Sequence, residues 1–431
     1  MKRTHDGLSG DGFGSAVSLT KNQLVKLKTR RKFWLDVHLW LGLLLGLLLA
    51  VYGATGSILV FHTEIDELLN PGLLKVRSDG GYLAYKPLAD IFEVGKSALP
   101  IDAKQTFATY PRNDEAAFQL AYLVPALDGK TEIWQVYVNP YTAQIVGKRL
   151  MGASDNLFPS TFIGFVFELH YSLLLKEEFG AVVVGVSAAL LIISVLTGLI
   201  VWWPLTGRWL QALTVKRKAS SERFNYDLHK TSGFYTALVM LPVLFSGIYM
   251  VLPQNVVPVL EVFSPVTYRY WFRSTPVAGE QAISMDKAVA IVDQRYPKGR
   301  PHWIYGAPNI YDTYTVCKDG VDRPGSWLQR ICVVVDRYSG KILDIDDPAD
   351  ASVGDVFTHW QWPLHSGQAF GWVGRILVFV TGLACPVLFI TGLIRWLQKK
   401  NAKSLCKSNS NKNTHNSFQL IANSDLKTSE D

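Results

Sequence analysis

The chain has 431 residues, of which 48% are hydrophobic and 18% are charged. So apolar a composition excludes a single soluble domain, and the charged share excludes a protein that lies wholly in lipid, so we expect membrane helices joined to water-exposed domains. The net charge of +7 comes from basic clusters beside apolar segments and requires no nucleic-acid partner.

The first apolar segment, residues 33–61, follows a basic cytoplasmic tail, residues 1–32. It exceeds the roughly 20 residues that cross a bilayer core. No A-x-A-like cleavage site follows it, so we predict a retained membrane helix. His38 lies near its start and His62 follows its end. The glycine- and serine-rich residues 1–20 predict disorder.

Residues 62–172 are predicted to form a small α+β domain on the outer side of the membrane. Its run TEIWQVYVNPYTAQIVG alternates apolar and polar residues on both sides of a turn, which is typical of two strands. His170 lies at the end of this domain, directly before the second predicted membrane helix, residues 173–203. A basic cytoplasmic loop, residues 204–228, leads to the third.

The third predicted membrane helix, residues 229–252, begins at His229. A second outer α+β domain follows at residues 253–366, where MDKAVAIVDQRYP has apolar residues at helical spacing. His365 lies at its end, and residues 367–397 are predicted to form the fourth membrane helix.

Two cysteines and the C-terminal tail complete the pattern. Cys317 and Cys332 lie in two β-rich runs of the second outer domain, where a disulfide fits an oxidising compartment and free thiols are the alternative. Residues 398–431 are predicted to be a cytoplasmic tail, disordered from residue 401.

Basic residues crowd three flanks of the apolar segments. These flanks precede the first segment, join the second to the third, and follow the fourth. By the positive-inside rule they are cytoplasmic, which places both α+β domains outside and both termini inside. The residues are Lys26, Lys28, Arg30, Arg31, Lys32, Lys216, Arg217, Lys218, Arg223, Lys399, Lys400 and Lys403.

The two halves of the chain share residue spacings, which indicates an internal repeat. His38 precedes Gly56 by 18 residues, and His229 precedes Gly247 by the same distance. The second and fourth apolar segments each contain the sequence TGLI, with its glycine 28 residues after His170 and 27 residues after His365. A unit of span, outer domain and span therefore occurs twice. The predicted fold class is an α-helical membrane protein, a four-span bundle with two small α+β outer domains.

Four histidines occupy matched positions in this repeat. An ionisable residue within a membrane segment is costly and is a functional candidate by default. The predicted topology places His38 and His229 at the cytoplasmic face, and His170 and His365 at the outer face. Two pairs at two depths are expected.

Small residues follow the cytoplasmic pair at i+4 and i+8, positions that share one helix face with the histidine. They are Gly42, Gly46, Gly233 and Ala237. Close helix packing explains the glycines alone. A haem explains glycines and histidines together, because its iron takes two axial nitrogens and its flat ring needs room. We therefore predict two b haems, ligated by His38 with His229 and by His170 with His365.

Other polar residues compete for roles at the outer face. His62 and His359 are alternative ligands of the outer haem, although neither has a repeat partner. His302, in the second outer domain, is either a surface residue or a contact for substrate. Arg375 could pair with a haem propionate or reach the lipid headgroups.

The motifs DVHLWLG, YVNPYTAQIVG, ELHYSLLL, DLHKTSG and PLHSGQAFG together resemble the PepSY-associated transmembrane family of bacterial inner membranes. The resemblance runs from about residue 31 to residue 398. The first turn departs from the usual TG by having Ala143 after Thr142. The resemblance implies four spans, two periplasmic PepSY-like domains and, in one branch, two haems b with histidine ligands.

Members of that branch resemble ferric-siderophore reductases, which implies an oxidoreductase that passes electrons outward to chelated Fe(III) in the periplasm. The electron donor is then a membrane quinol or a cytoplasmic reductase, and no catalytic residue is assigned. Two other functions remain open. One is a membrane-anchored sensor or inhibitor of a periplasmic peptidase, and the other is a proton or metal-ion carrier that uses the same imidazoles.

Overall fold

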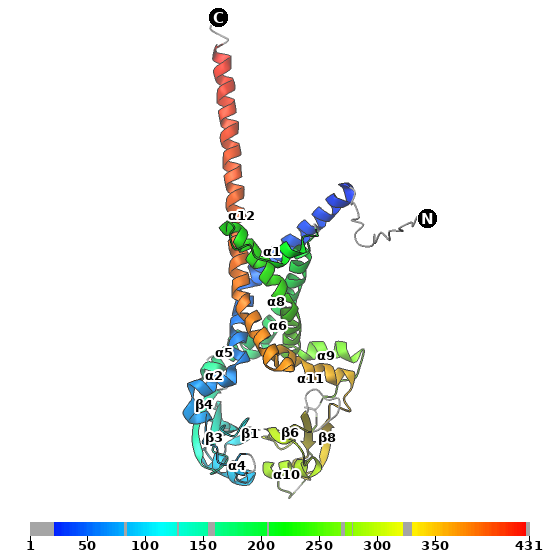
Figure 1. The fold of residues 1–431 in the computed structure, drawn as a ribbon. Helices are drawn as coiled ribbons and strands as arrows, with labels where there is room; N and C mark the ends of the chain where they lie inside the picture. The colour runs from blue at the N-terminus through cyan, green and yellow to red at the C-terminus, as the bar shows by residue number, and fades with distance from the viewer. Residues whose placement is uncertain are drawn as a thin grey trace, which may run out of the picture.

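The computed structural model describes residues 21–427 apart from 82–83, 127–128, 154–159, 205–206, 269–271, 278 and 322–329. Four long helices form a bundle, and a β-sheet with its own helices lies beyond one end of it (Figure 1). We call the bundle end that faces the sheet the sheet end, and the opposite end, where both chain termini lie, the tail end. The disorder predicted for residues 1–20 falls outside the described residues.

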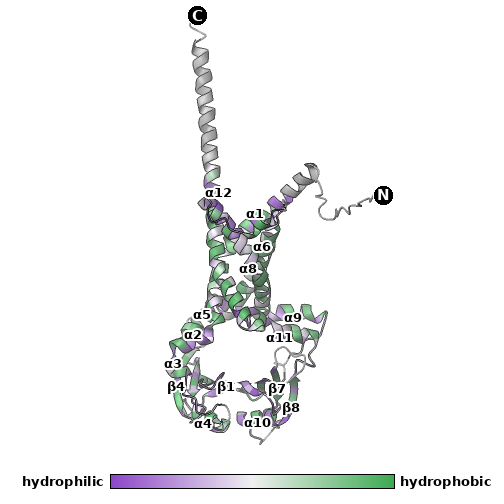
Figure 2. Ribbon diagram, in the orientation of Figure 1, coloured by the Kyte–Doolittle hydropathy of each residue, from purple (hydrophilic) through white to green (hydrophobic). Residues whose placement is uncertain are grey.

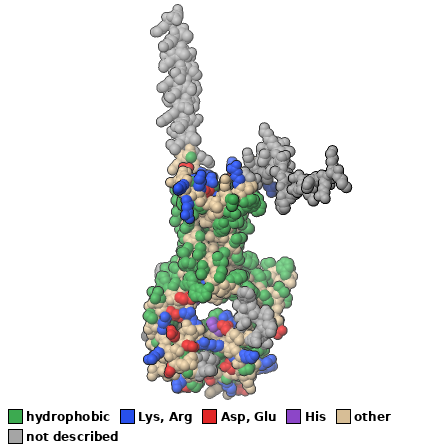
Figure 3. All heavy atoms as spheres, in the orientation of Figure 1, with side chains coloured by type: hydrophobic (Ala, Val, Ile, Leu, Met, Phe, Trp, Pro, Cys, Tyr) green, Lys and Arg blue, Asp and Glu red, His purple; other side chains and the backbone are tan. Residues whose placement is uncertain are grey.

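The bundle consists of four helices long and apolar enough to cross a membrane. Each helix packs against two others, in the cyclic order α1, α6, α8, α12. Most of their residues are apolar (Figure 2), and Figure 3 shows hydrophobic side chains over the visible surface of the bundle, as expected where spanning helices meet hydrocarbon. The four helices are α1 Lys21–Val60, α6 Glu177–Trp202, α8 Ser221–Val251 and α12 Gly371–Lys427.

The helix bounds differ from the expected ones at the tail end. Helix α8 begins at Ser221, well before the expected residue 229, because the Ser220 hydroxyl caps it by accepting the amide of Arg223. Helix α12 continues to Lys427 through the segment where we expected disorder. No proline follows Pro386 in this helix and no glycine follows Gly392, so no helix breaker interrupts it. The short helix α7, Trp209–Leu213, lies in the loop between α6 and α8.

At the sheet end, the second and fourth spans are each preceded by a separate short helix. Helix α5, Phe162–Tyr171, is broken from α6 at Leu173 and Leu174, both with φ of 57°. Helix α11, Val353–Ser366, ends at Gly367 with φ of 77°, and the 3-10 turn η3, Gln368–Phe370, leads into α12. Left-handed backbone stops a helix, so α5 and α11 are units distinct from the spans.

Both outer segments contribute to one antiparallel sheet of eight strands in the order β4-β3-β2-β1-β5-β6-β7-β8. We expected two small domains, but their first strands pair edge to edge, with Phe107 opposite Tyr305 and Thr109 opposite Trp303. The strands are β1 Lys104–Thr109, β2 Phe118–Pro125, β3 Thr131–Val138, β4 Ile145–Ala153, β5 Arg300–Tyr305, β6 Tyr314–Asp319, β7 Arg330–Val335 and β8 Ile342–Asp346.

Two helices cover the face of the sheet that points away from the bundle (Figure 1). They are α4, Leu88–Ser97, and α10, Met285–Arg295. Because side chains alternate along a strand, one face supplies the buried core, which includes Leu120 and Ile304. The opposite face looks toward the bundle across an opening, which Figure 3 shows in the space-filling view.

The two halves of the sheet are tied to the bundle in different ways. In the first half, carboxylates of α2, His62–Leu69, pair with arginines from elsewhere. Arg375 of α12 lies 2.8 Å from Glu64, and Arg149 of β4 lies 2.6 Å from Asp66. Arg375 therefore joins α12 of the bundle to α2. The short helix α3, Pro71–Leu74, follows α2.

The second half is connected to the bundle by hydrogen bonds, whereas a covalent bond joins two of its own strands. Asp355 of α11 accepts hydrogen bonds from the amide and hydroxyl of Thr267. Cys317 and Cys332 lie opposite each other in β6 and β7 and form a disulfide, which is one of the two alternatives that the sequence left open. Helix α9, Pro253–Glu261, follows α8 directly.

Candidate functional site: two histidine pairs in the bundle

The first histidine pair lies near the tail end of the bundle. His38 comes from α1 and His229 from α8, two helices that belong to opposite halves of the chain. Their ring centroids are 6.3 Å apart, with an angle of 64° between the ring planes. The structure thus brings together the residues that the sequence assigned to one pair.

The second pair lies at the sheet end. His170 comes from α5 and His365 from α11, and their ring centroids are 6.0 Å apart with an angle of 69° between the planes. In α1, 18 residues separate His38 from Gly56, the residue on which His170 packs. At 1.5 Å per residue this spacing places the two pairs roughly 27 Å apart along the helix axis.

Each imidazole packs on a glycine of another helix. A β-carbon on Gly198 would lie 2.9 Å from Cε1 of His38, and one on Gly392 would lie 3.2 Å from Cε1 of His229. At the sheet end, Gly56 and Gly247 receive His170 and His365 in the same manner, each at 3.1 Å from Cε1. Any larger residue would push the ring away, so these glycines act as seats for the four imidazoles.

In the tail-end pair, both Nδ1 atoms are committed to hydrogen bonds. Nδ1 of His38 donates to the carbonyl oxygen of Ser194 at 2.8 Å. Nδ1 of His229 lies 2.9 Å from the Thr391 hydroxyl, which donates its own proton to the carbonyl of Val387. The Thr391 oxygen therefore accepts from His229, and Nε2 of each ring is left as the nitrogen that can bind a metal.

The sheet-end pair repeats this arrangement. Nδ1 of His170 lies 2.9 Å from the hydroxyl of Thr55, which donates to the carbonyl of Val51. Nδ1 of His365 lies 3.0 Å from the carbonyl of Val243 and 3.1 Å from the Ser246 hydroxyl. In each pair, one imidazole is oriented by a backbone carbonyl and the other by a threonine.

The seats share a local sequence, a serine or threonine followed by glycine. These dipeptides are Thr55-Gly56, Thr197-Gly198, Ser246-Gly247 and Thr391-Gly392, one on each spanning helix. The sequence revealed them as repeat markers, but it did not reveal that they hold the imidazoles. The repeated spacing along the chain marks these glycines. Their contact with the imidazoles depends on the packing of helices that are far apart in the chain.

The small residues that were expected to leave space beside the tail-end pair differ in how much space they leave. A β-carbon on Gly42 would have no atom within 4 Å, and one on Gly233 would meet only Leu388 at 3.6 Å. These two glycines do leave space beside the tail-end pair. At Gly46, however, a β-carbon would lie 2.6 Å from the ring of Phe389, so this glycine serves the contact between α1 and α12.

Tyr52 is a site residue that sequence reasoning missed. Its ring centroid lies 6.2 Å from that of His170, and its hydroxyl hydrogen-bonds with the Ser187 hydroxyl at 2.9 Å. Tyr52 is buried in the bundle core. It supports the His170 ring from the side that faces the tail-end pair along α1.

The two competing histidines have other partners. Nδ1 of His62 donates to the carbonyl of Leu59 in its own chain segment at 2.8 Å. Nε2 of His359 lies 3.1 Å from the carboxylate of Asp346 in β8. The structure thus uses His359 to connect α11 to the sheet.

His302 lies on the sheet. Its Nδ1 is 3.1 Å from the carboxylate of Asp319, which also pairs with Arg330 at 2.6 Å. Burial lowers the pKa of His302 below its usual value, although the charge of Asp319 opposes this change. The guanidinium of Arg330 in turn covers the ring of Trp303, 4.4 Å from its centroid.

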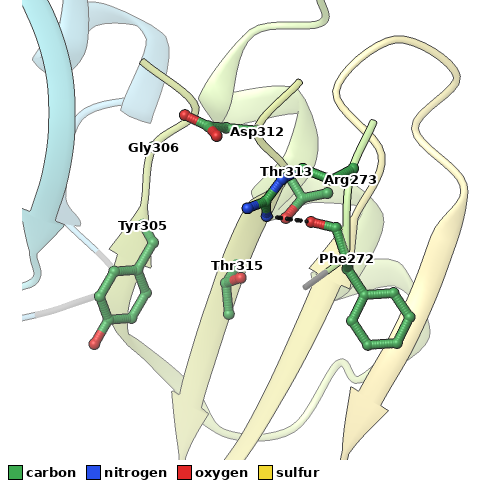
Figure 4. Close-up of a pocket in the computed structure, with 7 residues that line it drawn as sticks. All are labelled: Phe272, Arg273, Tyr305, Gly306, Asp312, Thr313 and Thr315. Atoms are coloured by element: carbon green, nitrogen blue, oxygen red, sulfur yellow. Dashed lines mark hydrogen bonds between the residues drawn. The ribbon is translucent and has the colours of Figure 1, made fainter. Parts of the chain in front are cut away.

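A cavity of about 370 Å³ opens on the sheet, next to β5 and β6. Figure 4 shows Arg273 directed toward Thr313 and Thr315, with Tyr305 at the other side of the cavity. This cavity contains none of the four paired histidines. Any reaction at the histidine pairs therefore does not take place in it.

The donor set of each pair fits the iron of a porphyrin. Two imidazoles that bind one metal from opposite sides, each with a metal–nitrogen bond of about 2 Å, place their ring centroids roughly 6 Å apart. The observed separations are 6.3 Å and 6.0 Å. Within the described part of the chain, no group of three or more His, Cys, Asp or Glu side chains could hold a metal ion. A porphyrin needs only two protein ligands.

The chain matches a known family model over most of its length. The model of the PepSY-associated TM region matches residues 35–399, which is most of the chain. A search of curated proteins finds no match.

Proposed function

The chain belongs to the PepSY-associated TM family, and from this premise we propose that it is a dihaem b electron-transfer protein that reduces an acceptor on the sheet side of a bacterial inner membrane. The observation that carries the proposal is the geometry of the two histidine pairs in the bundle. Their centroid separations are 6.3 Å and 6.0 Å, and hydrogen bonds at Nδ1 leave Nε2 to bind iron.

The residues of each pair have separate tasks in this proposal. His38 and His229 would hold one haem, and His170 and His365 the other. A bound haem supplies a one-electron change between Fe(III) and Fe(II). Thr391 and Thr55 fix the orientation and tautomer of their imidazoles by accepting the Nδ1 proton, which also makes Nε2 a stronger donor.

Two sites are needed because of the thickness of the membrane. A hydrocarbon core is about 30 Å thick, and the pairs are separated by 18 residues of α1. With one site near each surface, an electron can enter at one face and leave at the other, and the roughly 27 Å along α1 between the sites is crossed inside the protein. The intervening core contains the buried side chains of Tyr52, Leu191 and Met240, which exclude water from the path.

The orientation follows from charge and from the disulfide. Lysine and arginine side chains gather at the tail end of the bundle (Figure 3), which favours the cytoplasm for that end. The disulfide of Cys317 and Cys332 favours an oxidising compartment for the sheet. We therefore assign the sheet to the periplasm and both termini to the cytoplasm, with each half contributing a PepSY-like domain of a duplicated unit.

The acceptor is inferred from its chemistry and from the family. Chelated Fe(III) prefers hard oxygen donors, and one added electron weakens that preference and releases Fe(II). A ferric siderophore is the acceptor that we propose. The electron donor would be a membrane quinol or a cytoplasmic reductase that meets the tail end.

The test is spectroscopic. Membranes that contain the protein should show a b-type reduced-minus-oxidised spectrum and about two haems per chain. After anaerobic reduction of the purified protein in nanodiscs, a ferric hydroxamate or catecholate should reoxidise it, with Fe(II) trapped by a colorimetric chelator. A folded but colourless protein would reject the proposal in favour of a peptidase sensor or an ion carrier.

A further inference from the structure

Helix α9 runs away from the bundle at the sheet end. It begins at Pro253, directly after α8 ends at Val251, and Figure 1 shows it extending sideways from the bundle. Val259 of α9, with Val262 and Phe263 in the turn that directly follows the helix, are 60%, 78% and 84% exposed. These three exposed apolar side chains lie within five residues of one another, at the end of α9 that is farther from the bundle, and we call them the apolar face of α9.

The corresponding helix of the first half is held quite differently. Helix α2 follows the span α1, and its carboxylates pair with arginines of α12, of β4 and of the loop between β1 and β2. The pairs are Glu64–Arg375, Asp66–Arg149 and Glu67–Arg112. From Leu241 to Tyr268 the second half has a single charged residue, Glu261. Helix α9 thus lacks the charges that hold α2.

We propose that α9 lies in the interface between the membrane and water, with Val259, Val262 and Phe263 among the lipid chains near the headgroups. A helix that starts where a span ends, and runs sideways from it, lies at the level of the membrane surface. Glu261, the last residue of α9, is two residues from Val259, which places it on the opposite side of the helix from Val259, toward water. An apolar face opposite a polar one is typical of helices at a membrane surface.

Lipid is the occupant that best fits the size and surroundings of this face. A stable contact with another protein needs about 20 residues on each side, whereas this face has three exposed apolar side chains. Hydrophobic side chains also continue from the bundle onto this side of the molecule, as Figure 3 shows. Lipid already has to cover the bundle, so it can cover α9 without a further partner.

The proposed contact would also fix the depth of α11. The segment after α9 is hydrogen-bonded to the start of α11, since the amide of Gly354 donates to the Ser264 hydroxyl and that of Thr267 to Asp355. Helix α11 carries His365. The position of α9 at the surface would therefore help to set the height of the sheet-end pair in the membrane.

Spin labels on the full chain test the proposal, in vesicles of phosphatidylcholine and phosphatidylglycerol and in a background of Cys385→Ala and Cys406→Ser. The test label is at Val262→Cys. The matched controls are Leu44→Cys in α1, 72% exposed, and Ile101→Cys between α4 and β1, 93% exposed. All three positions are open in the protein, so a difference between them reports the surroundings.

The expected result is that oxygen relaxes the Val262 label as it does the Leu44 label. A water-soluble nickel complex should reach the Val262 label several-fold less than the Ile101 label. Equal access of the nickel complex at Val262 and Ile101 would overturn the proposal. Low access of both reagents, or spin–spin broadening between chains, would overturn it in favour of a protein partner or a second copy. The measurement needs no haem, so its outcome is independent of the proposed electron transfer.

Discussion

The two histidine pairs have nearly the same ring separation, 6.3 Å and 6.0 Å, but they are carried by different kinds of helix. At the tail end, His38 and His229 belong to long spans that run through the membrane. At the sheet end, His170 and His365 belong to the short helices α5 and α11, which are broken from the spans by left-handed residues. The tail-end pair is therefore part of the rigid bundle, whereas the sheet-end pair is connected to the sheet, where the acceptor would bind.

This difference matters for function because α11 has a direct contact with the sheet. His359 of α11 lies 3.1 Å from Asp346 of β8, and Asp355 binds the backbone of Thr267. Movement of the sheet can reach His365 through α11. The tail-end pair has no such short helix between it and the spans.

The largest expected effect comes from removing one ligand. His229→Ala should abolish haem binding at the tail end and leave the sheet-end haem in place, so that total haem falls by about half in a pyridine haemochrome assay. His365→Ala should do the converse. His62→Ala and His359→Ala are the matched controls and should retain both haems. Equal loss of both haems in His229→Ala would show that the pairing is different.

A smaller effect is expected when a seat is filled. Gly198→Ala places a β-carbon 2.9 Å from His38, and Gly56→Ala places one 3.1 Å from His170. Because α5 is a separate short helix that can shift, we expect Gly56→Ala to lose less haem than Gly198→Ala. Gly42→Ala has open space and serves as the control. Haem content and the two reduction potentials measure the outcome, and a loss in Gly42→Ala equal to that in Gly198→Ala would contradict the seat.

A still smaller effect on the haems is expected when Thr391 or Thr55 is replaced. Thr391→Val and Thr55→Val keep the side-chain shape but remove the oxygen that accepts the Nδ1 proton of His229 or His170. The imidazole then becomes a weaker donor, so the affected haem should have a higher reduction potential and about tenfold weaker retention. Redox titration should show the change at the tail-end haem in Thr391→Val and at the sheet-end haem in Thr55→Val. Identical shifts of both haems in either variant would disprove the assignment.

The smallest expected effect is on stability, and it comes from removing the ion pair between Glu64 and Arg375. Burial alone would raise the pKa of Glu64, but hydrogen bonding and charge from Arg375 outweigh it and hold the pKa below its ordinary value of 4.5. Since the folded protein favours the ionised form, the stabilisation is complete above pH 4.5 and is lost as the pH falls through the lower, folded-state pKa. Glu64→Gln should lower the free energy of unfolding by under about 1 kcal/mol at neutral pH, because the ion pair is partly exposed.

The control for this prediction is Glu93→Gln, at an exposed position of α4. The difference in melting temperature between Glu64→Gln and the parent protein should shrink as the pH falls below 4.5. A difference that stays constant over this range would show that the charge of Glu64 does not contribute.

Much of the site could be predicted from the sequence, because its signals are local or repeated. Apolar length identified the four spans, and the common spacing from His38 to Gly56 and from His229 to Gly247 identified the histidines. The alternation of apolar residues around a turn located β3 and β4. These features depend on neighbouring residues, so they can be read along one segment.

Other features depended on contacts between segments far apart in the chain. The assignment of Gly46 to the slot failed because Phe389 of α12 occupies the space beside it. The partner of Arg375 is Glu64, which no local pattern connects with it.

By itself, the sequence determined where the chain enters lipid, where its strands turn and which histidines occur at matched positions. Only the tertiary structure decided that β1 pairs with β5 to make one sheet, and that each imidazole rests on a glycine of another helix. The reason is physical. Hydrophobic periodicity acts over a few residues, whereas strand order and ring packing are set by the close fit of surfaces that meet only after the chain has folded.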